Sequence, residues 1–234
     1  MKPLGRWAAA VVTFVATGGI FTAAAARPAD LSWNEAFPVE ASKPEVYLDA
    51  RFLGSDGTLH RLQSWRRGIE FLHRRTDDSL DLYLESADGQ SDYRYRLFDH
   101  QRRVSIGANR GHLYRIGVFS DWFGLAHVVD RPKTRFTVRA VPALSDEARR
   151  DCAWRLLVRE TPSGPDRSRI CWSASWGLPL AIRVSGPKGT WVDRFVVKRL
   201  DDRVISPEDL SVPATPDGYA FFDAGKEIAP ESGD

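Results

Sequence analysis

The sequence lacks the signals of several large protein classes. Outside residues 7–21 it has no apolar run that approaches the length of a membrane span. Without Lys2 and Arg6 it contains 31 basic and 31 acidic residues, and this balance argues against a broad nucleic-acid-binding surface. It has no low-complexity tract and no heptad pattern. Its aromatic content, with eight Trp, argues against disorder on a large scale.

The common catalytic and metal-binding motifs are also missing. There is no phosphate-binding glycine loop, no His-Glu-x-x-His and no Gly-x-Ser-x-Gly. The histidines are not spaced as metal ligands, and His73 and His100 stand among charged residues as solvated strand ends do. Acidic pairs at 77–78 and 201–202 fall in predicted turns, where aspartate is common. We expect no metal, no cofactor and no catalytic residue, although two acids that meet only in the fold would escape this search.

Residues 1–26 have the pattern of a secretory signal peptide. Lys2 and Arg6 precede the apolar stretch over 7–21, and the small residues that follow end in Ala26, the expected cleavage site. The apolar stretch is short for a membrane span and is interrupted by two glycines; an uncleaved anchor is the alternative. We expect a periplasmic protein that keeps no stable membrane span after cleavage.

Cys152 and Cys171 are the two cysteines, and an even number in an exported protein favours a disulfide. Turn residues at 162–165 lie between them, as in a hairpin. The alternation of apolar and polar residues places Cys152 on the same strand face as Trp154 and Cys171 on a more polar face. A disulfide across two paired strands needs both cysteines on one face. A bulge or a frayed strand end would reconcile the two, and free buried thiols are the alternative.

Apolar residues alternate with polar ones over most of the chain, which predicts a mainly β protein. Leu80, Leu82 and Leu84 share one face of a predicted half-buried strand. Turn residues recur roughly every 8–12 residues, which is typical of an antiparallel meander. The predicted strands cover 45–53, 58–65, 69–75, 80–86, 93–98, 112–119, 152–160, 169–176, 178–184 and 191–199.

A helix is predicted after residue 119. Ser120 is the expected N-cap, Asp121 suits the first turn, and Pro132 ends the segment. Shorter helical pieces are predicted at 32–36 and 145–149. The apolar residues that repeat at helical spacing are Trp122, Phe123, Ala126 and Val129.

Aromatic residues are the remaining candidates for a binding site. In a closed core the tryptophans of the second half simply pack against aliphatic neighbours. In an open sheet they line a cavity, as in lipid-binding barrels, and the predicted helix forms a lid over it. The candidate cavity-lining residues are Trp122, Phe123, Trp154, Trp172, Trp176 and Trp191.

The order of signals over residues 46–223 resembles the periplasmic lipoprotein-carrier superfamily, which includes the LolA, LolB and RseB-like proteins. The stretches that carry the likeness are Trp65-Arg66-Arg67-Gly68-Ile69 with Leu72-His73-Arg74-Arg75, then Trp176-Gly177-Leu178-Pro179-Leu180-Ala181-Ile182, and Val204-Ile205-Ser206-Pro207-Glu208-Asp209-Leu210 with Val212-Pro213 and Pro216-Asp217-Gly218-Tyr219. The resemblance implies a curved antiparallel sheet forming an open half-barrel, with one or two short helices covering its hydrophobic face. It also implies binding of acyl chains or of a hydrophobic partner segment, without catalysis.

These observations predict four segments: a signal peptide over 1–26, an irregular segment over 27–45, the half-barrel domain over 46–223 and a flexible tail over 224–234. The leading hypothesis is a periplasmic, non-enzymatic binding protein that accepts a lipid, lipoprotein or other hydrophobic ligand. The alternative is an envelope sensor or accessory protein that binds a protein partner. A hydrolase is a third hypothesis, for which the sequence supplies no residue pair.

Overall fold

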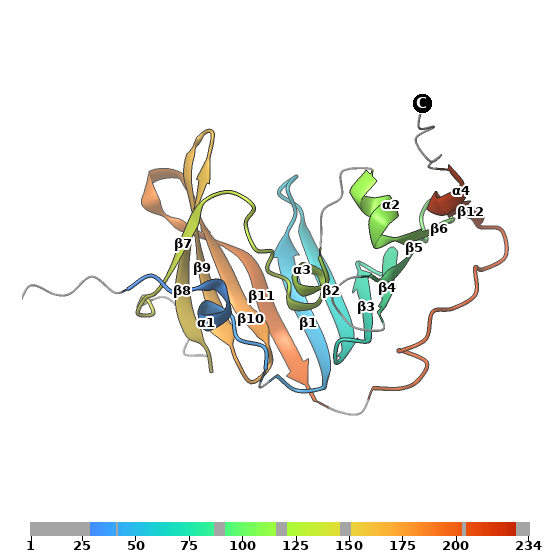
Figure 1. Cartoon of the computed structure of the whole chain (residues 1–234), viewed down its shortest axis with the longest axis horizontal. Coiled ribbons are helices and arrows are strands. Elements are labelled where there is room, and N and C mark those ends of the chain that lie inside the picture. The colour runs from blue at the N-terminus through green and yellow to red at the C-terminus, as the bar shows by residue number, and fades with distance from the viewer. Residues whose placement is uncertain are drawn as a thin grey trace, which may run out of the picture.

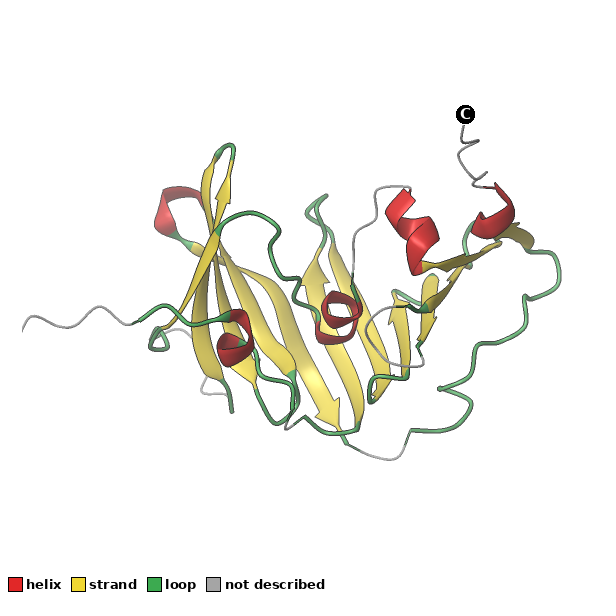
Figure 2. Cartoon of the chain, viewed as in Figure 1, coloured by secondary structure: helices red, strands yellow, loops and turns green. Residues whose placement is uncertain are grey.

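The computed structural model describes residues 29–227 except 41, 87–91, 116–120, 146–150 and 203–204, so the predicted signal peptide lies outside the described residues. One open, curved sheet of twelve strands, in the order β12-β6-β5-β4-β3-β2-β1-β11-β10-β9-β8-β7, dominates the fold and does not close into a barrel (Figures 1 and 2). The ladders are antiparallel, except that β12 runs parallel to β6. The prediction of a mainly β, open half-barrel is confirmed.

Every predicted strand is present except the one over 112–119, whose described part lies in a helix. The strands of the sheet are β1 (Glu45–Leu53), β2 (Leu59–Arg67), β3 (Phe71–Thr76), β4 (Leu80–Glu85), β5 (Arg94–Asp99), β6 (Val104–Asn109), β7 (Phe136–Ala140), β8 (Ala153–Thr161), β9 (Gly164–Ser173), β10 (Leu178–Ser185), β11 (Trp191–Asp201) and β12 (Ala220–Asp223). The sequence did not predict β6, β7 or β12. It also extended β9 too far, because Trp176 lies in the turn that follows Ser173.

The helices are short: α1 (Trp33–Ala36), α2 (Arg110–Arg115), α3 (Trp122–His127), α4 (Ala224–Glu227) and the 3-10 turn η1 (Pro187–Gly189). α1 confirms the helix predicted there, with Ser32 as its N-cap. α2 replaces the start of the strand predicted over 112–119, and α4 occupies the beginning of the predicted tail. The helix predicted over 145–149 lies almost wholly outside the described residues.

No helix in the described ranges has both the length and the apolar character that crossing a bilayer requires.

The disulfide between Cys152 and Cys171 is present, with 5.3 Å between the two Cα atoms. The last ladder pair at this end of the β8–β9 hairpin is Ala153 with Trp172, and Cys152 precedes it. Cys171 pairs with Trp154 and therefore shares a face with Trp154 and Cys152, so its predicted place on the opposite, more polar face was wrong and no conflict of faces arises.

Removing this disulfide should destabilise the fold. We expect the double change Cys152→Ala and Cys171→Ala to lower the free energy of unfolding by about 3 kcal/mol, because the bond closes a loop of about twenty residues in the unfolded chain. Urea unfolding followed by circular dichroism measures the change. Wild type under reducing conditions is the control and should lose a similar amount; an unchanged midpoint in both would show that the bond adds no stability.

The two faces of the sheet have different coverings. Because cross-strand partners share a face, Arg66, Leu72 and Leu84 point to one side, and neighbouring Trp65, His73 and Tyr83 point to the other. We call the first the concave face, since α3 lies against it, and the second the convex face. Figure 1 shows α1, α2 and α3 inside the curve and the chain between β11 and β12 outside it.

Candidate functional site

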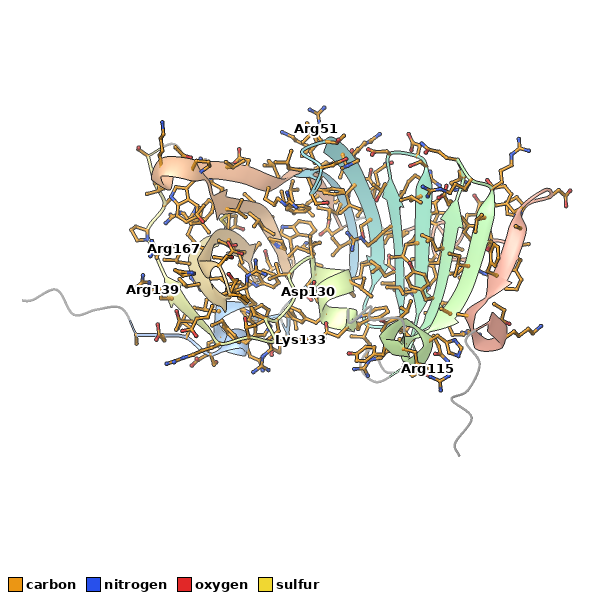
Figure 3. All side chains as sticks on the ribbon, turned by 90° about the horizontal axis from the view of Figure 1, so that it is seen from above. Arg51, Arg115, Asp130, Lys133, Arg139 and Arg167 are labelled. Carbon is orange, nitrogen blue, oxygen red and sulfur yellow. A yellow bond between two sulfur atoms is a disulfide. The ribbon has the colours of Figure 1, made fainter. Side chains whose placement is uncertain are left out.

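α3 lies at the centre of the concave face and joins its apolar clusters. Trp122 packs in one cluster with Leu72 and Leu84, whereas Phe123 packs against a second that contains Trp33 and Trp172. Figure 3 shows Asp130, at the end of this segment, near the middle of the sheet. A helix of six residues therefore fills the space between the two halves of the curved sheet.

Local interactions define where α3 begins and ends. The N-cap is Asp121 and not the predicted Ser120: its carboxylate accepts a hydrogen bond from the Gly124 amide at 2.9 Å. The helix ends at Val128, whose φ of 65° is the left-handed conformation. A β-branched residue held there costs about 1–2 kcal/mol, so the end of α3 is strained.

Two arginines of the sheet hold the C-terminal end of α3. Arg66 of β2 donates from Nη1 to the Ala126 carbonyl at 3.4 Å and from Nη2 to the Trp176 carbonyl at 2.9 Å. Arg74 of β3 donates to the Leu125 carbonyl at 3.3 Å. Cations suit this position, because the last carbonyls of a helix lack intrahelical partners and carry partial negative charge.

Arg66 is a buried cation whose partners are neutral. Its residue is only 3% exposed, and within the described residues it makes no ion pair. Burial lowers the pKa of Arg66 to about 10, which leaves it protonated at neutral pH. Burial also lowers the pKa of Arg74, against the opposing charge of the Asp130 carboxylate. Burying a charge without a counterion is costly, so this anchor holds α3 less firmly than its hydrogen bonds imply.

His127 connects α3 to the turn after β9. Its Nδ1 lies 2.5 Å from the Gly177 carbonyl oxygen, which only accepts, so we assign the proton to Nδ1 as the donor. Arg66 Nη1 lies 2.8 Å from the same nitrogen, but with the proton on Nδ1 both groups are donors, so this contact is not a hydrogen bond. Burial, and then the charge of Arg66, lower the pKa of His127 to about 4, so the ring is neutral at pH 7.

We expect α3 to loosen in mild acid. Because the pKa of His127 is lower in the folded state than its unfolded value of about 6.5, stability is lost as the pH falls from about 6.5 towards 4. At pH 5 the loss is on the order of 2 kcal/mol. Hydrogen exchange of residues 121–129 at pH 7 and pH 5, corrected for intrinsic rates, measures it. His127→Gln should remove this pH dependence, and an equal dependence in the variant would contradict the assignment.

The structure separates the six predicted cavity-lining residues. Phe123 and Trp172 come together, with ring centroids 6.3 Å apart, and Trp122 lies on the other side of α3. Trp154 pairs with Cys171, and Trp172 pairs with Ala153, so the two indoles point to opposite faces of the sheet.

Trp191 lies on the same side as Trp154, and Arg169 lies over both rings at 5.4 and 5.7 Å from their centroids. Trp176 lies in its turn, beneath Lys43. The geometry places only Trp122, Phe123 and Trp172 around α3, and their role in ligand binding stays a prediction.

Three cavities among the described residues, of about 600, 240 and 440 Å³, are lined by none of the six predicted residues. A ligand on the part of the concave face that α3 covers would have to take the place of α3.

A polar cluster on the convex face escaped the sequence analysis. Asp81, with a side chain 5% exposed, lies 2.7 Å from His73 Nε2, 2.8 Å from His100 Nε2 and 2.9 Å from Arg75 Nε. Burial opposes ionisation of Asp81, but these hydrogen bonds outweigh it and hold the pKa of the carboxyl below its ordinary value. His73 is buried, so its prediction as a solvated strand end was wrong.

A signal for this cluster was available in the sequence. The turn at Asp77 and Asp78, both with positive φ, sets the β3–β4 register in which Arg75 faces Asp81.

No group of ligands suited to a metal ion occurs among the described residues.

Comparison with known proteins gives little beyond the geometry. No protein-family model and no curated protein matches the sequence. Among solved structures, the crystal structure of MucB is similar to this chain at 16% sequence identity and a TM-score of 0.38, over 76% of this chain and 60% of that one. This chain thus spans less than two thirds of the MucB chain, and the likeness is too low for a statement about function to rest on it.

Proposed function

We propose that this protein is a periplasmic, non-enzymatic binding protein that accepts a lipid or another apolar ligand on its concave face, in the place that α3 occupies. The observation that carries the proposal is the anchor of α3. A short helix covers apolar side chains and is held by Arg66 and Arg74, which donate to the carbonyl oxygens of Ala126 and Leu125.

The energetic balance supports a displaceable α3. The helix has six residues and ends in a strained valine, and it is far too short to be stable without its tertiary contacts. An acyl chain that takes its place gains about 0.8 kcal/mol for each methylene removed from water. Arg66 and Arg74, released from the carbonyls of α3, would then face the ligand.

The predicted leader supports an extracytoplasmic location, and the disulfide is consistent with an oxidising compartment.

The Asp81 cluster is explained by its structural contacts, so the proposal assigns no catalytic step to it.

Native mass spectrometry of gently purified protein, with lipid extraction alongside, tests the proposal first. A stoichiometric lipid or acyl-chain adduct is the expected result. Titration with N-phenyl-1-naphthylamine, a neutral apolar fluorophore, gives a second measurement on the ligand-free protein. If neither a lipid adduct nor saturable binding of the fluorophore were found, the proposal would be contradicted.

Arg66→Met should raise the affinity for this neutral probe. The variant loses the hydrogen bond from Arg66 to the Ala126 carbonyl of α3, and we expect about tenfold tighter binding because one bond from a charged donor is worth about 1.5–3 kcal/mol. Arg67→Met, at the exposed neighbouring position on the other face, is the matched control and should leave the affinity unchanged. Equal effects of the two changes would show that α3 does not gate the site.

A further inference from the structure

The charges of this protein are separated between the two halves of its sheet. Residues 131–145 and 151–169, which include β7, β8 and part of β9, contain eight basic and three acidic residues. Residues 201–227, which lead from β11 to β12 and α4, contain two basic and seven acidic residues. β7 and β12 are the two edges of the sheet and lie at opposite ends of the molecule (Figure 1). The overall balance of charge therefore conceals a cationic end and an anionic one.

The strand register places the side chains of the cationic end on the convex face. Arg139 of β7 pairs with Leu156 of β8, and Val158 of β8 pairs with Arg167 of β9, so these four side chains share one face. Val138, next to Arg139, points the other way, into the cluster beside α1 inside the curve. We define the basic patch as the convex-face residues Arg135, Arg139, Leu156, Val158 and Arg167.

The guanidinium groups of the basic patch are accessible. The Arg135 carbonyl accepts a hydrogen bond from the Glu160 amide at 2.9 Å, which continues the β7–β8 ladder and puts Arg135 on the face of Arg139. The Arg135 side chain is 83% exposed, and its ion pair with the exposed Glu160 is long, at 3.8 Å. Arg167 is exposed and Arg139 is half-buried, and neither has an acidic partner among the described residues. Figure 3 shows these two arginines at the same end of the molecule.

An apolar strip lies between these arginines. Leu156 and Val158 are both half-buried on β8, so part of each side chain faces solvent. Since adjacent strands are about 4.8 Å apart, Arg139 and Arg167 stand on strands about 10 Å apart, on either side of the strip. The patch lines none of the three cavities described above. An open sheet face with an apolar centre and cationic margins suits a broad anionic surface better than a single small anion.

We propose that the basic patch docks this protein on a lipid bilayer that contains anionic phospholipids. Lipid phosphates pair with the three arginines, because guanidinium groups bind phosphate through parallel hydrogen bonds. The apolar strip adds burial at the edge of the acyl region, the second contribution on which peripheral binding depends. Residues 201–227 are repelled by the same surface, so the protein docks in one orientation. The patch is separate from the concave site and does not depend on it.

Co-sedimentation with vesicles tests the proposal. The protein is purified from the periplasm, and its mass is checked to confirm that the predicted leader is absent, because a retained leader would itself bind lipid. Vesicles contain either phosphatidylcholine alone or equal parts of phosphatidylcholine and phosphatidylglycerol. The variant carries Arg135→Gln, Arg139→Gln and Arg167→Gln. Its affinity for the anionic vesicles should fall about hundredfold, because each basic residue at such a surface contributes about fivefold.

A matched variant makes the same change of charge in the other half of the sheet, at the exposed residues Arg102→Gln, Arg103→Gln and Lys226→Gln. It should bind anionic vesicles as wild type does, and circular dichroism verifies that both variants are folded. Added salt should weaken the binding of wild type, and vesicles of phosphatidylcholine alone should bind little of it.

Two results would overturn the proposal: wild type that binds both kinds of vesicle equally or neither of them, and equal losses in the two variants. Binding to poly-glutamate without binding to vesicles would assign the patch to an acidic protein and overturn the bilayer as its partner. The patch variant should take up N-phenyl-1-naphthylamine as wild type does. The vesicle and fluorophore measurements therefore test the basic patch and the concave site independently.

Discussion

Asp81→Asn should lower the free energy of unfolding by about 4 kcal/mol at pH 7, because it leaves the buried His73 and the half-buried Arg75 and His100 without a charged acceptor. Asp81 accepts hydrogen bonds from His73, His100 and Arg75, and its side chain is 5% exposed. An asparagine has one oxygen in place of two and turns N–H donors towards groups that also donate. Urea unfolding followed by circular dichroism measures the loss.

The pH dependence of this loss follows from the direction of the pKa shift. The folded pKa of Asp81 lies below its unfolded value, so the stability it contributes is present above about pH 4 and is lost as the pH falls through the folded value. The difference between wild type and Asp81→Asn should therefore be smaller at pH 3 than at pH 7. Asp78→Asn, in the exposed turn, is the control with little expected effect. A difference that grows in acid would contradict the assignment.

Trp172→Ala should lower the free energy of unfolding by about 4 kcal/mol, as much as Asp81→Asn, because it leaves a large cavity in a packed core. Trp172 is 2% exposed, lies 5.2 Å from the ring of Phe37 and donates from Nε1 to the Pro38 carbonyl at 3.0 Å. The change also removes the ring that Phe123 stacks on, so hydrogen exchange in α3 should rise more than in β3 or β4.

Trp176→Ala is the matched control for Trp172→Ala. Trp176 lies in a turn, and its described ring contact is with Lys43 at 5.0 Å. A partly exposed cation–π pair of this kind is worth about 0.5–1 kcal/mol. If Trp172→Ala and Trp176→Ala lowered the free energy of unfolding by similar amounts, the cluster around Trp172 would not be the main core of this half of the sheet.

The strand pattern could be predicted from the sequence where side chains alternate and turns are distinct. The alternation at Leu80, Leu82 and Leu84 predicts the place of β4, and β1 has the predicted bounds. The prediction that β4 is half-buried was wrong, because Leu80 is exposed while Asp81 and Tyr83 on the other face are buried. β6 was missed because its sequence, Val-Ser-Ile-Gly-Ala-Asn, has small residues where an alternating strand has large ones. β7 and β12 are short and depend on pairing with distant segments.

The candidate site could be predicted only in part. The helix could be predicted because Trp122, Phe123, Ala126 and Val129 are apolar at helical spacing, whereas its role as a lid stays a prediction. The anchor could not be predicted, because Arg66 and Ala126 are sixty residues apart and a backbone carbonyl leaves no mark in the sequence. The tryptophans were grouped by residue type, whereas the register and the disulfide end of the β8–β9 hairpin decide which face each occupies.

Hydrogen exchange of α3 with and without N-phenyl-1-naphthylamine tests the central claim most directly, that α3 is a displaceable cover of a ligand site. In the free protein, residues 121–129 should exchange through openings well below the free energy of global unfolding, while β2 and β3 stay protected. A saturating probe should raise exchange in α3 and leave the two strands protected. Exchange of α3 only at the rate of global unfolding, unchanged by the probe, would contradict the account.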